Sequence, residues 1–169
     1  GYEQGSNADY NKEIAMDETR LFRFLNTTQA DKMKQLRLEN DPLEKEKFLQ
    51  RLDQSLHTNG VIDLLRKGFR YKHLVLDVFY VRPSPGNETA AKLYAQNIFS
   101  VTRQLQYSRQ NPLLALDVCL FLNGLPIVTM ELKNQLTKQN AADAVKQYKD
   151  ERTPDEVLFS FKRCIVHFA

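Results

Sequence analysis

Glycine, cysteine and histidine are all scarce in this chain, and each shortage excludes a kind of site. The six glycines are scattered and no G-x-x-x-x-G-K-[ST] motif occurs, so the chain does not bind ATP through a phosphate loop. The two cysteines, Cys119 and Cys164, lie in strand-like apolar runs and are predicted to be small buried hydrophobes in a reducing compartment. His57, His73 and His167 are far apart, with no Cys or carboxylate at zinc-ligand spacing, which argues against a structural zinc site.

The sequence also lacks a long apolar run and a strong charge of either sign. No run of about 18 apolar residues exists, and the polar start GYEQGSNADYNKE has no apolar core of the secretory kind. We therefore expect a cytoplasmic protein with no membrane partner. The formal net charge of +3 is too small to indicate a nucleic-acid partner by itself, although a local basic groove is compatible with it.

The first half of the chain has the pattern of a helical segment. Residues 1–14 are polar and are predicted to be poorly ordered, whereas apolar residues recur with helical spacing from about 16 to 65. Within that range Asp41-Pro42 has the cap and the first-turn proline of a helix start, and Asn59-Gly60 has the pattern of a helix end.

After Gly68 the composition becomes typical of strands, with many β-branched and aromatic residues. The resulting order predicts an α/β domain in which a mixed β-sheet is flanked by helices, preceded by the helical segment. We expect residues 1–70 to pack on a core of residues 71–169, and the abrupt end inside an apolar run suggests a fragment of a longer chain. The predicted strands are 73–81, 97–107, the two arms of a hairpin at 114–133, and 157–168; the predicted helices are 87–96 and 141–151.

The hairpin carries three charged residues at its open end. Its sequence, DVCLFLNGLPIVTMELK, begins with Asp117, turns at Asn123-Gly124, and ends with Glu131 and Lys133. Both runs are apolar on both faces, which predicts central strands of the sheet. A carboxylate in such a place costs free energy unless a cation meets it.

The register of the hairpin decides whether its two carboxylates share a face. A plain two-residue turn at Asn123-Gly124 would point Asp117 and Glu131 to opposite faces, because side chains alternate along a strand. A three-residue loop, or an equivalent bulge, puts them on one face. In the three-residue loop Asp117 opposes Thr129 and lies diagonal to Glu131, with α-carbons about 7–8 Å apart. We predict this loop or its equivalent.

Two neighbouring carboxylates and an amine match the needs of phosphodiester hydrolysis. Carboxylate oxygens suit Mg²⁺, which can activate a water and neutralise charge on a phosphodiester. Lys133 lies two residues after Glu131, on the same face, and adds a cation for the water or the transition state. A Glu-x-Lys pair at a strand end is also commonly a solvated salt bridge, and spacing alone does not separate the two interpretations.

The segment LDVCLFLNGLPIVTMELKN resembles the nuclease segment of the restriction (R, or HsdR) subunits of type I restriction–modification enzymes. The similarity covers nearly the whole chain, because further stretches resemble family sequences in the family order. These stretches are RFLNTTQADKMKQL (23–36), GVIDLLRKGF (60–69), IFSVTRQLQYS (98–108), DAVKQYKDER (143–152) and FKRCIVHFA (161–169).

This resemblance implies a restriction-endonuclease-like PD-(D/E)xK fold that cuts double-stranded DNA with Mg²⁺. Carried over by residue, the first acid of the motif is Asp117, the second is Glu131 and the lysine is Lys133. The carbonyl of Leu132 becomes a further metal ligand beside the two acids. Leu116 stands where the motif has its nominal proline, at a position that varies widely.

Four other residues are candidates for supporting the site or contacting DNA. The family's Q-x-x-x-Y element is not present in that spacing, since Gln147 and Tyr148 are adjacent. They lie on different sides of a helix, so at most one faces the site, and we favour Gln147. Lys146 is a candidate phosphate contact or part of a solvated helix face, and Gln104 is either a supporting donor or a packing residue.

The resemblance also implies partners that this chain does not contain. In such subunits an ATP-driven translocase follows the nuclease domain, so ATP binds only in the full-length protein, and methyltransferase and specificity subunits recognise the DNA sequence. Two other functions remain open. A non-catalytic docking module of the same fold is opposed by the presence of all three charged residues, and a repair or recombination nuclease is opposed by the matches outside the motif.

Overall fold

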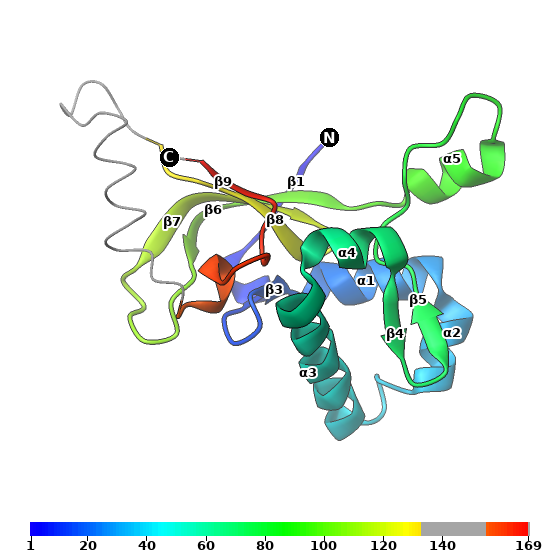
Figure 1. The fold of residues 1–169 in the computed structure, drawn as a ribbon, viewed down its shortest axis with the longest axis horizontal. Helices are drawn as coiled ribbons and strands as arrows, with labels where there is room; N and C mark the ends of the chain where they lie inside the picture. Colours follow the sequence, from blue (N-terminus) through cyan, green and yellow to red (C-terminus); the bar gives the residue numbers. More distant parts are fainter. Residues whose placement is uncertain (133–154, 169) are drawn as a thin grey trace.

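The computed structural model describes residues 1–132 and 155–168 and forms a mixed α/β fold, as predicted (Figure 1). The predicted helix at 141–151 lies outside the described residues. Among those described, no helix combines the length and the apolar character needed to cross a membrane. The helices are α1 (Glu18–Thr28), α2 (Ala30–Leu36), α3 (Pro42–Asn59), α4 (Val61–Lys67) and α5 (Glu88–Tyr94), with short 3-10 turns η1 (Asn7–Asp9) and η3 (Val157–Phe159).

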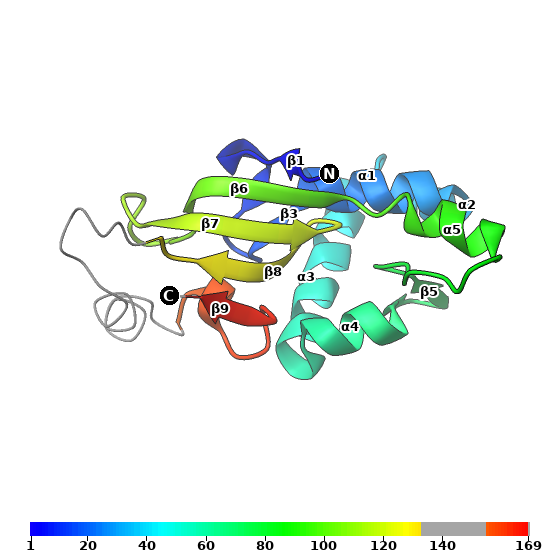
Figure 2. The same cartoon turned by 90° about the horizontal axis from the view of Figure 1, so that it is seen from above.

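The main sheet has five strands in the order β1-β6-β7-β8-β9. The pairs β6–β7 and β7–β8 are antiparallel, whereas β1 and β9 lie parallel to β6 and β8, so the sheet is mixed and β7 is central. Figure 2 shows this sheet beside the helical half of the molecule. Its strands are β1 (Glu3–Gln4), β6 (Phe99–Gln106), β7 (Ala115–Leu122), β8 (Leu125–Met130) and β9 (Val166–Phe168); two further hairpins are β2 (Tyr10–Asn11) with β3 (Met16–Asp17), and β4 (Phe69–Tyr71) with β5 (Leu74–Leu76).

The helix boundaries follow from the capping residues in the sequence. The Asp17 side chain accepts a hydrogen bond from the Arg20 N–H at the start of α1, and Asp41 accepts one from the Glu44 N–H at the start of α3. Gly60, with φ of 87°, ends α3 as predicted. The predicted helical pattern of 16–65 is therefore confirmed, divided into four helices.

Two predicted strands are much shorter than their apolar patterns suggested. The prediction over 73–81 was wrong beyond Leu76, because the backbone N–H and C=O of Asp77 bond to the side chain of Gln29 at 2.9 and 2.7 Å instead of to a strand. The prediction over 157–168 was wrong before Val166. There Lys162 has φ of 69°, and its carbonyl accepts a hydrogen bond from the Val61 N–H of α4.

The N-terminal segment is ordered, so the prediction that residues 1–14 are poorly ordered was wrong. β1 adds a parallel strand to β6, and the Gly5 N–H bonds to the Val101 carbonyl at 2.8 Å. The polar composition of this segment misled the prediction, since several of its polar groups bond to the rest of the folded protein.

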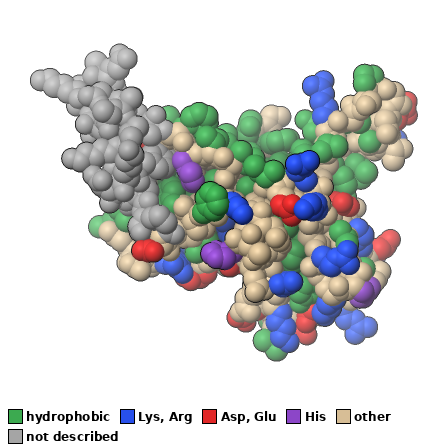
Figure 3. Space-filling view, viewed as in Figure 1, with side chains coloured by type: hydrophobic (Ala, Val, Ile, Leu, Met, Phe, Trp, Pro, Cys, Tyr) green, Lys and Arg blue, Asp and Glu red, His purple; other side chains and the backbone are tan. Residues whose placement is uncertain are grey.

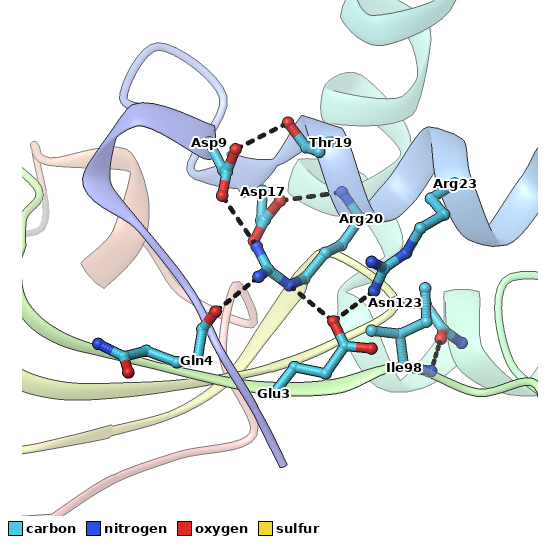
Figure 4. Close-up of polar contacts among 9 residues, drawn as sticks. All are labelled: Glu3, Gln4, Asp9, Asp17, Thr19, Arg20, Arg23, Ile98 and Asn123. Carbon is cyan, nitrogen blue, oxygen red and sulfur yellow. Dashed lines mark hydrogen bonds and ion pairs between the residues drawn. The ribbon is translucent and has the colours of Figure 1, made fainter.

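A buried guanidinium holds this segment against α1 (Figure 4). Arg20 donates to the Asp17 carboxylate at 2.7 Å, to the Asp9 carboxylate at 3.1 Å and to the Gln4 carbonyl at 2.7 Å. Its Nε also lies 3.6 Å from Glu3. Burial raises the pKa of Asp17, and the Arg20 hydrogen bonds oppose that rise. One arginine therefore joins β1, η1 and the start of α1.

Buried side chains form two clusters, one in each half of the molecule. The sheet cluster contains both cysteines, which are free and buried as predicted, and burial raises the pKa of each thiol. The helical cluster draws on residues from both sides of position 70, and the division into two parts stays a prediction. Representative members of the helical cluster are Leu21, Phe24, Phe48, Leu52, Leu56, Phe69, Leu76 and Leu125; those of the sheet cluster are Tyr10, Leu105, Tyr107, Leu116, Cys119, Phe121, Leu158 and Cys164.

The tip of the β7–β8 hairpin docks on the helical half. Asn123 and Gly124 both have positive φ, 50° and 83°, which is the geometry of a two-residue type I′ turn. The Gly124 carbonyl accepts a hydrogen bond from the Asp17 N–H at 2.9 Å, and the buried Asn123 amide donates to the Val78 carbonyl at 2.9 Å. The β7–β8 hairpin is thus anchored to the helical half at its turn.

Replacing Gly124 by alanine should strongly destabilise the protein. A Cβ at Gly124 would lie 2.3 Å from the Asp17 carbonyl oxygen, whereas a Cβ at Gly86, which has a similar φ of 88°, would meet nothing within 4 Å. We expect Gly86→Ala to lower the free energy of unfolding by about 1 kcal/mol and Gly124→Ala by about 2–4 kcal/mol. Urea unfolding of both variants checks this, and equal losses would show that the close approach at Gly124 does not matter.

His167 should make stability depend on pH. Its Nδ1 lies 2.6 Å from the Thr129 hydroxyl across the β8–β9 pair, and burial lowers its pKa. The unfolded chain therefore takes up this proton at a higher pH than the folded chain does. The contribution of neutral His167 is complete above about pH 6.5 and is lost as the pH falls below that value.

The comparison of wild type with His167→Gln isolates this effect from other titrating groups. Unfolding measured between pH 7 and 5 should show a smaller loss of stability for His167→Gln than for wild type. His57→Gln, at an exposed position on α3, serves as the control. An unchanged pH slope in His167→Gln would contradict the assignment.

Candidate functional site

The register of the β7–β8 hairpin places the two predicted acids opposite each other. The predicted three-residue loop was wrong, because Leu122 pairs with Leu125 across a two-residue turn. The predicted alternative, an equivalent bulge, is present: the register shifts between Leu120 and Phe121, so that Ile127 is the extra residue. The proline at 126 has no N–H for a ladder bond, and the Ile127 carbonyl accepts from the Ile165 N–H at 2.9 Å.

The shifted register determines which face carries the acids. Cys119 pairs with Thr129 and Val118 with Met130, so the next step along the same register sets Asp117 opposite Glu131. The predicted pairing of Asp117 with Thr129 was therefore wrong, because Thr129 pairs with Cys119. Directly opposed residues share a face of the sheet, with Cβ atoms about 4.5–5.5 Å apart.

Two hydrogen bonds fix the orientation of the Asp117 carboxylate. The side-chain amide of Gln104, on β6, donates to Asp117 Oδ1 at 2.8 Å, and the backbone N–H of Leu132 donates to Asp117 Oδ2 at 2.7 Å. Of the two interpretations of Gln104, the structure brings it to the acid as a donor.

Glu131 lies just after β8, where the pairing with β9 continues for one residue. Its N–H donates to the Phe168 carbonyl at 3.0 Å, and the residue is only 7% exposed. Leu132 follows, with an exposed side chain and with its N–H directed at Asp117. The backbone of residues 131–132 is thus held between the neighbouring strands β7 and β9.

The oxygen atoms at this place have the chemistry that Mg²⁺ prefers. Two carboxylates and one backbone carbonyl, those of Asp117, Glu131 and Leu132, are hard ligands, and Mg²⁺ commonly binds through one or two carboxylates while keeping several waters. Within residues 1–132 and 155–168, no group of three or more His, Cys, Asp or Glu side chains is placed to hold a metal.

Several predicted site residues lie outside the described residues. These are Lys133, Lys146, Gln147 and Tyr148.

The N-terminal segment also reaches this part of the sheet, which the sequence did not predict. The Asn7 side-chain amide bonds to the backbone of β6 on either side of Leu105, with Nδ2 donating to the Gln104 carbonyl at 3.0 Å and Oδ1 accepting from the Gln106 N–H at 2.8 Å. An exposed asparagine in a polar segment carries no sequence signal for such a role.

A large groove elsewhere on the protein is separate from the hairpin. Its volume is about 1010 Å³, and it lies between α1, α2 and the start of α3. None of the residues that line it belongs to β6, β7 or β8, so it is not part of the candidate site. Its lining includes Phe22, Met33, Arg37, Leu38 and Lys45.

Basic and acidic side chains are mixed on the face shown in Figure 3. Lysines and arginines lie over α3, α4 and the β4–β5 hairpin, with carboxylates among them. Lys67 pairs with Asp63 at 2.5 Å, and Lys72 pairs with Glu44. The net charge of +3 therefore does not give this face a uniform basic surface.

Comparison with known proteins supplies the family. A family model described as type I restriction enzyme R protein N terminus (HSDR_N) matches residues 4–168, which is nearly the whole chain. Comparison with curated proteins and with solved structures found no match. The resemblance drawn from the hairpin and the stretches around it is confirmed, and the chain belongs to the family formed by the N-terminal part of type I restriction enzyme R proteins.

Proposed function

We propose that this chain is the Mg²⁺-dependent endonuclease part of a type I restriction enzyme, which hydrolyses phosphodiester bonds of double-stranded DNA. The observation that carries the proposal is the bulged register of β7 and β8, which sets Asp117 opposite Glu131 when it is continued by one residue from the Val118–Met130 pair. The Gln104 amide on the neighbouring strand fixes Asp117. Membership of the R protein family supports the same conclusion.

Different residues of the chain would have different roles in hydrolysis. The reaction forms a bond between a water oxygen and phosphorus and breaks one P–O bond of the DNA backbone. The oxygens of Asp117, Glu131 and Leu132 would hold Mg²⁺, which supplies a polarised water and offsets the charge that develops on the phosphate. Gln104 and the Leu132 N–H keep the Asp117 carboxylate turned in one direction, and the Lys133 amine would orient the attacking water or stabilise the developing negative charge.

The proposal extends to the complex in which such a chain works. Cleavage would follow translocation of DNA by an ATP-driven motor in the full-length R protein, which is where ATP would bind. Methyltransferase and specificity subunits would recognise the DNA sequence, so this domain would read no bases. Gln147, Tyr148 and Lys146 remain candidates for DNA contact or support. We propose the cytoplasm as the compartment, since the substrate is intracellular duplex DNA.

Substitution of the three motif residues should abolish cleavage without stopping the motor. We expect Asp117→Asn, Glu131→Gln and Lys133→Ala, each in the full R protein assembled with its partner subunits, to lower Mg²⁺-dependent nicking of circular DNA by about 100-fold or more. ATP hydrolysis should stay unchanged, because the motor lies elsewhere in the full-length protein. A nicking assay in parallel with an ATPase assay measures both.

Glu88→Gln provides a matched control, since Glu88 is an exposed carboxylate on α5 and is not part of the β7–β8 hairpin. This variant should cut like wild type. Normal cleavage by all three motif variants would overturn the nuclease proposal and favour a docking module of the same fold.

A further inference from the structure

β6 is bent at the residue that contacts the candidate site. Gln104 has φ of 49°, in the left-handed region that residues other than glycine rarely occupy. The strand pairs normally on either side, with Arg103 opposite Val118 and Leu105 opposite Leu116. The bend is therefore confined to Gln104, whose side chain reaches Asp117. A conformation that costs about 1–2 kcal/mol persists only where its surroundings hold it.

The Asn7 side chain stabilises this conformation, because it bonds to the backbone of β6 as a neighbouring strand would. Its Nδ2 donates to the Gln104 carbonyl at 3.0 Å, and its Oδ1 accepts from the Gln106 N–H at 2.8 Å. A carbonyl and the N–H two residues later are the two groups that a neighbouring strand would bond on one edge. The side-chain amide of Asn7 thus continues the β1–β6 ladder past the point where β1 ends at Gln4.

The position of Asn7 is itself fixed on both sides. The Ser6 hydroxyl accepts from the Ala8 N–H and starts the short turn η1. Arg20 donates to the Gln4 carbonyl before this turn and to the Asp9 carboxylate within it, as Figure 4 shows. Asn7 therefore lies between two points held by the same buried guanidinium.

We propose that Asn7 is a positioning residue of the candidate nuclease site. It holds the left-handed bend of β6 at Gln104, and the bend directs the Gln104 amide to Asp117. This inference rests on the proposed function, because its consequence is the orientation of a metal-binding carboxylate. Asn7 touches neither DNA nor metal and acts through Gln104.

The test is a double-substitution cycle in the assembled enzyme. Substituting a residue that hydrogen-bonds to a metal-ligating carboxylate typically changes metal affinity or activity by about 10- to 100-fold. We expect Gln104→Ala to raise the Mg²⁺ concentration for half-maximal nicking within that range. Asn7→Ala, one contact further away, should raise it by about 3- to 10-fold. Because Asn7 acts through Gln104, the double variant should equal Gln104→Ala alone.

Two further variants separate positioning from general loss of structure. Asn11→Ala removes an asparagine side chain of the same segment that bonds to Glu18 of α1 rather than to β6, and it should leave the Mg²⁺ dependence of wild type. Asn7→Asp keeps an acceptor for the Gln106 N–H but sets a carboxylate oxygen against the Gln104 carbonyl, so it should raise the Mg²⁺ requirement at least as much as Asn7→Ala. Thermal unfolding of every variant identifies any that fails to fold.

Hydrogen exchange gives a readout that is independent of cleavage. In the full R protein, the peptide that contains the Gln106 N–H should exchange faster in Asn7→Ala than in Asn11→Ala. Unchanged exchange would show that Asn7 does not hold the strand.

The outcomes distinguish the two proposals. Normal cleavage by Asp117→Asn would overturn the nuclease site and with it the role of Asn7. Loss of cleavage in Asp117→Asn, together with wild-type Mg²⁺ dependence in Asn7→Ala or with multiplicative effects in the double variant, would overturn the role of Asn7 alone.

Discussion

One inserted residue in β8 determines what the open end of the hairpin presents on each face of the sheet. Without the bulge at Ile127, the tight Asn123-Gly124 turn would set Asp117 and Glu131 on opposite faces, because side chains alternate along a strand. With it, the two acids oppose each other while the turn stays in the geometry that Asn-Gly favours. The candidate site therefore depends on two local features of the chain, a type I′ turn and a proline next to the bulge.

The ends of this hairpin are anchored by different parts of the molecule. The closed end is fixed to the helical half, where the Gly124 carbonyl bonds to Asp17 at the start of α1. Asp17 is also the most buried partner of Arg20, whose other bonds hold β1 and η1. A buried ion pair of this kind contributes little net stability, since desolvation offsets the attraction, but it defines a unique arrangement of the segments that it joins. The N-terminal segment reaches the open end of the hairpin through that arrangement.

The sequence predicted those parts of the fold in which a local signal decides the structure. Asp41-Pro42 and Gly60 gave the limits of α3, and the apolar runs around Asn123-Gly124 gave the hairpin. Local sequence patterns gave the wrong secondary structure where a residue distant in the sequence bonds to the backbone. At Asp77, the N–H and C=O groups bond to the side chain of Gln29. For the candidate site, the sequence indicated which acids to consider, whereas their relative register depended on the position of the bulge in β8. The contribution of Asn7 was not readable, because it depends on a contact between residues 97 positions apart.

That separation has a consequence for how the protein folds. Residues 3–9 complete their contacts only after residue 106 has been synthesised, since β1 and Asn7 both bond to β6. Closing so long a loop is slow, and contacts of this kind form late. The helices are built from local contacts, so they can form before this loop closes. Residues 3–9 would then be the last to dock, and a variant without them would keep its helices but lose the β1 edge of its main sheet.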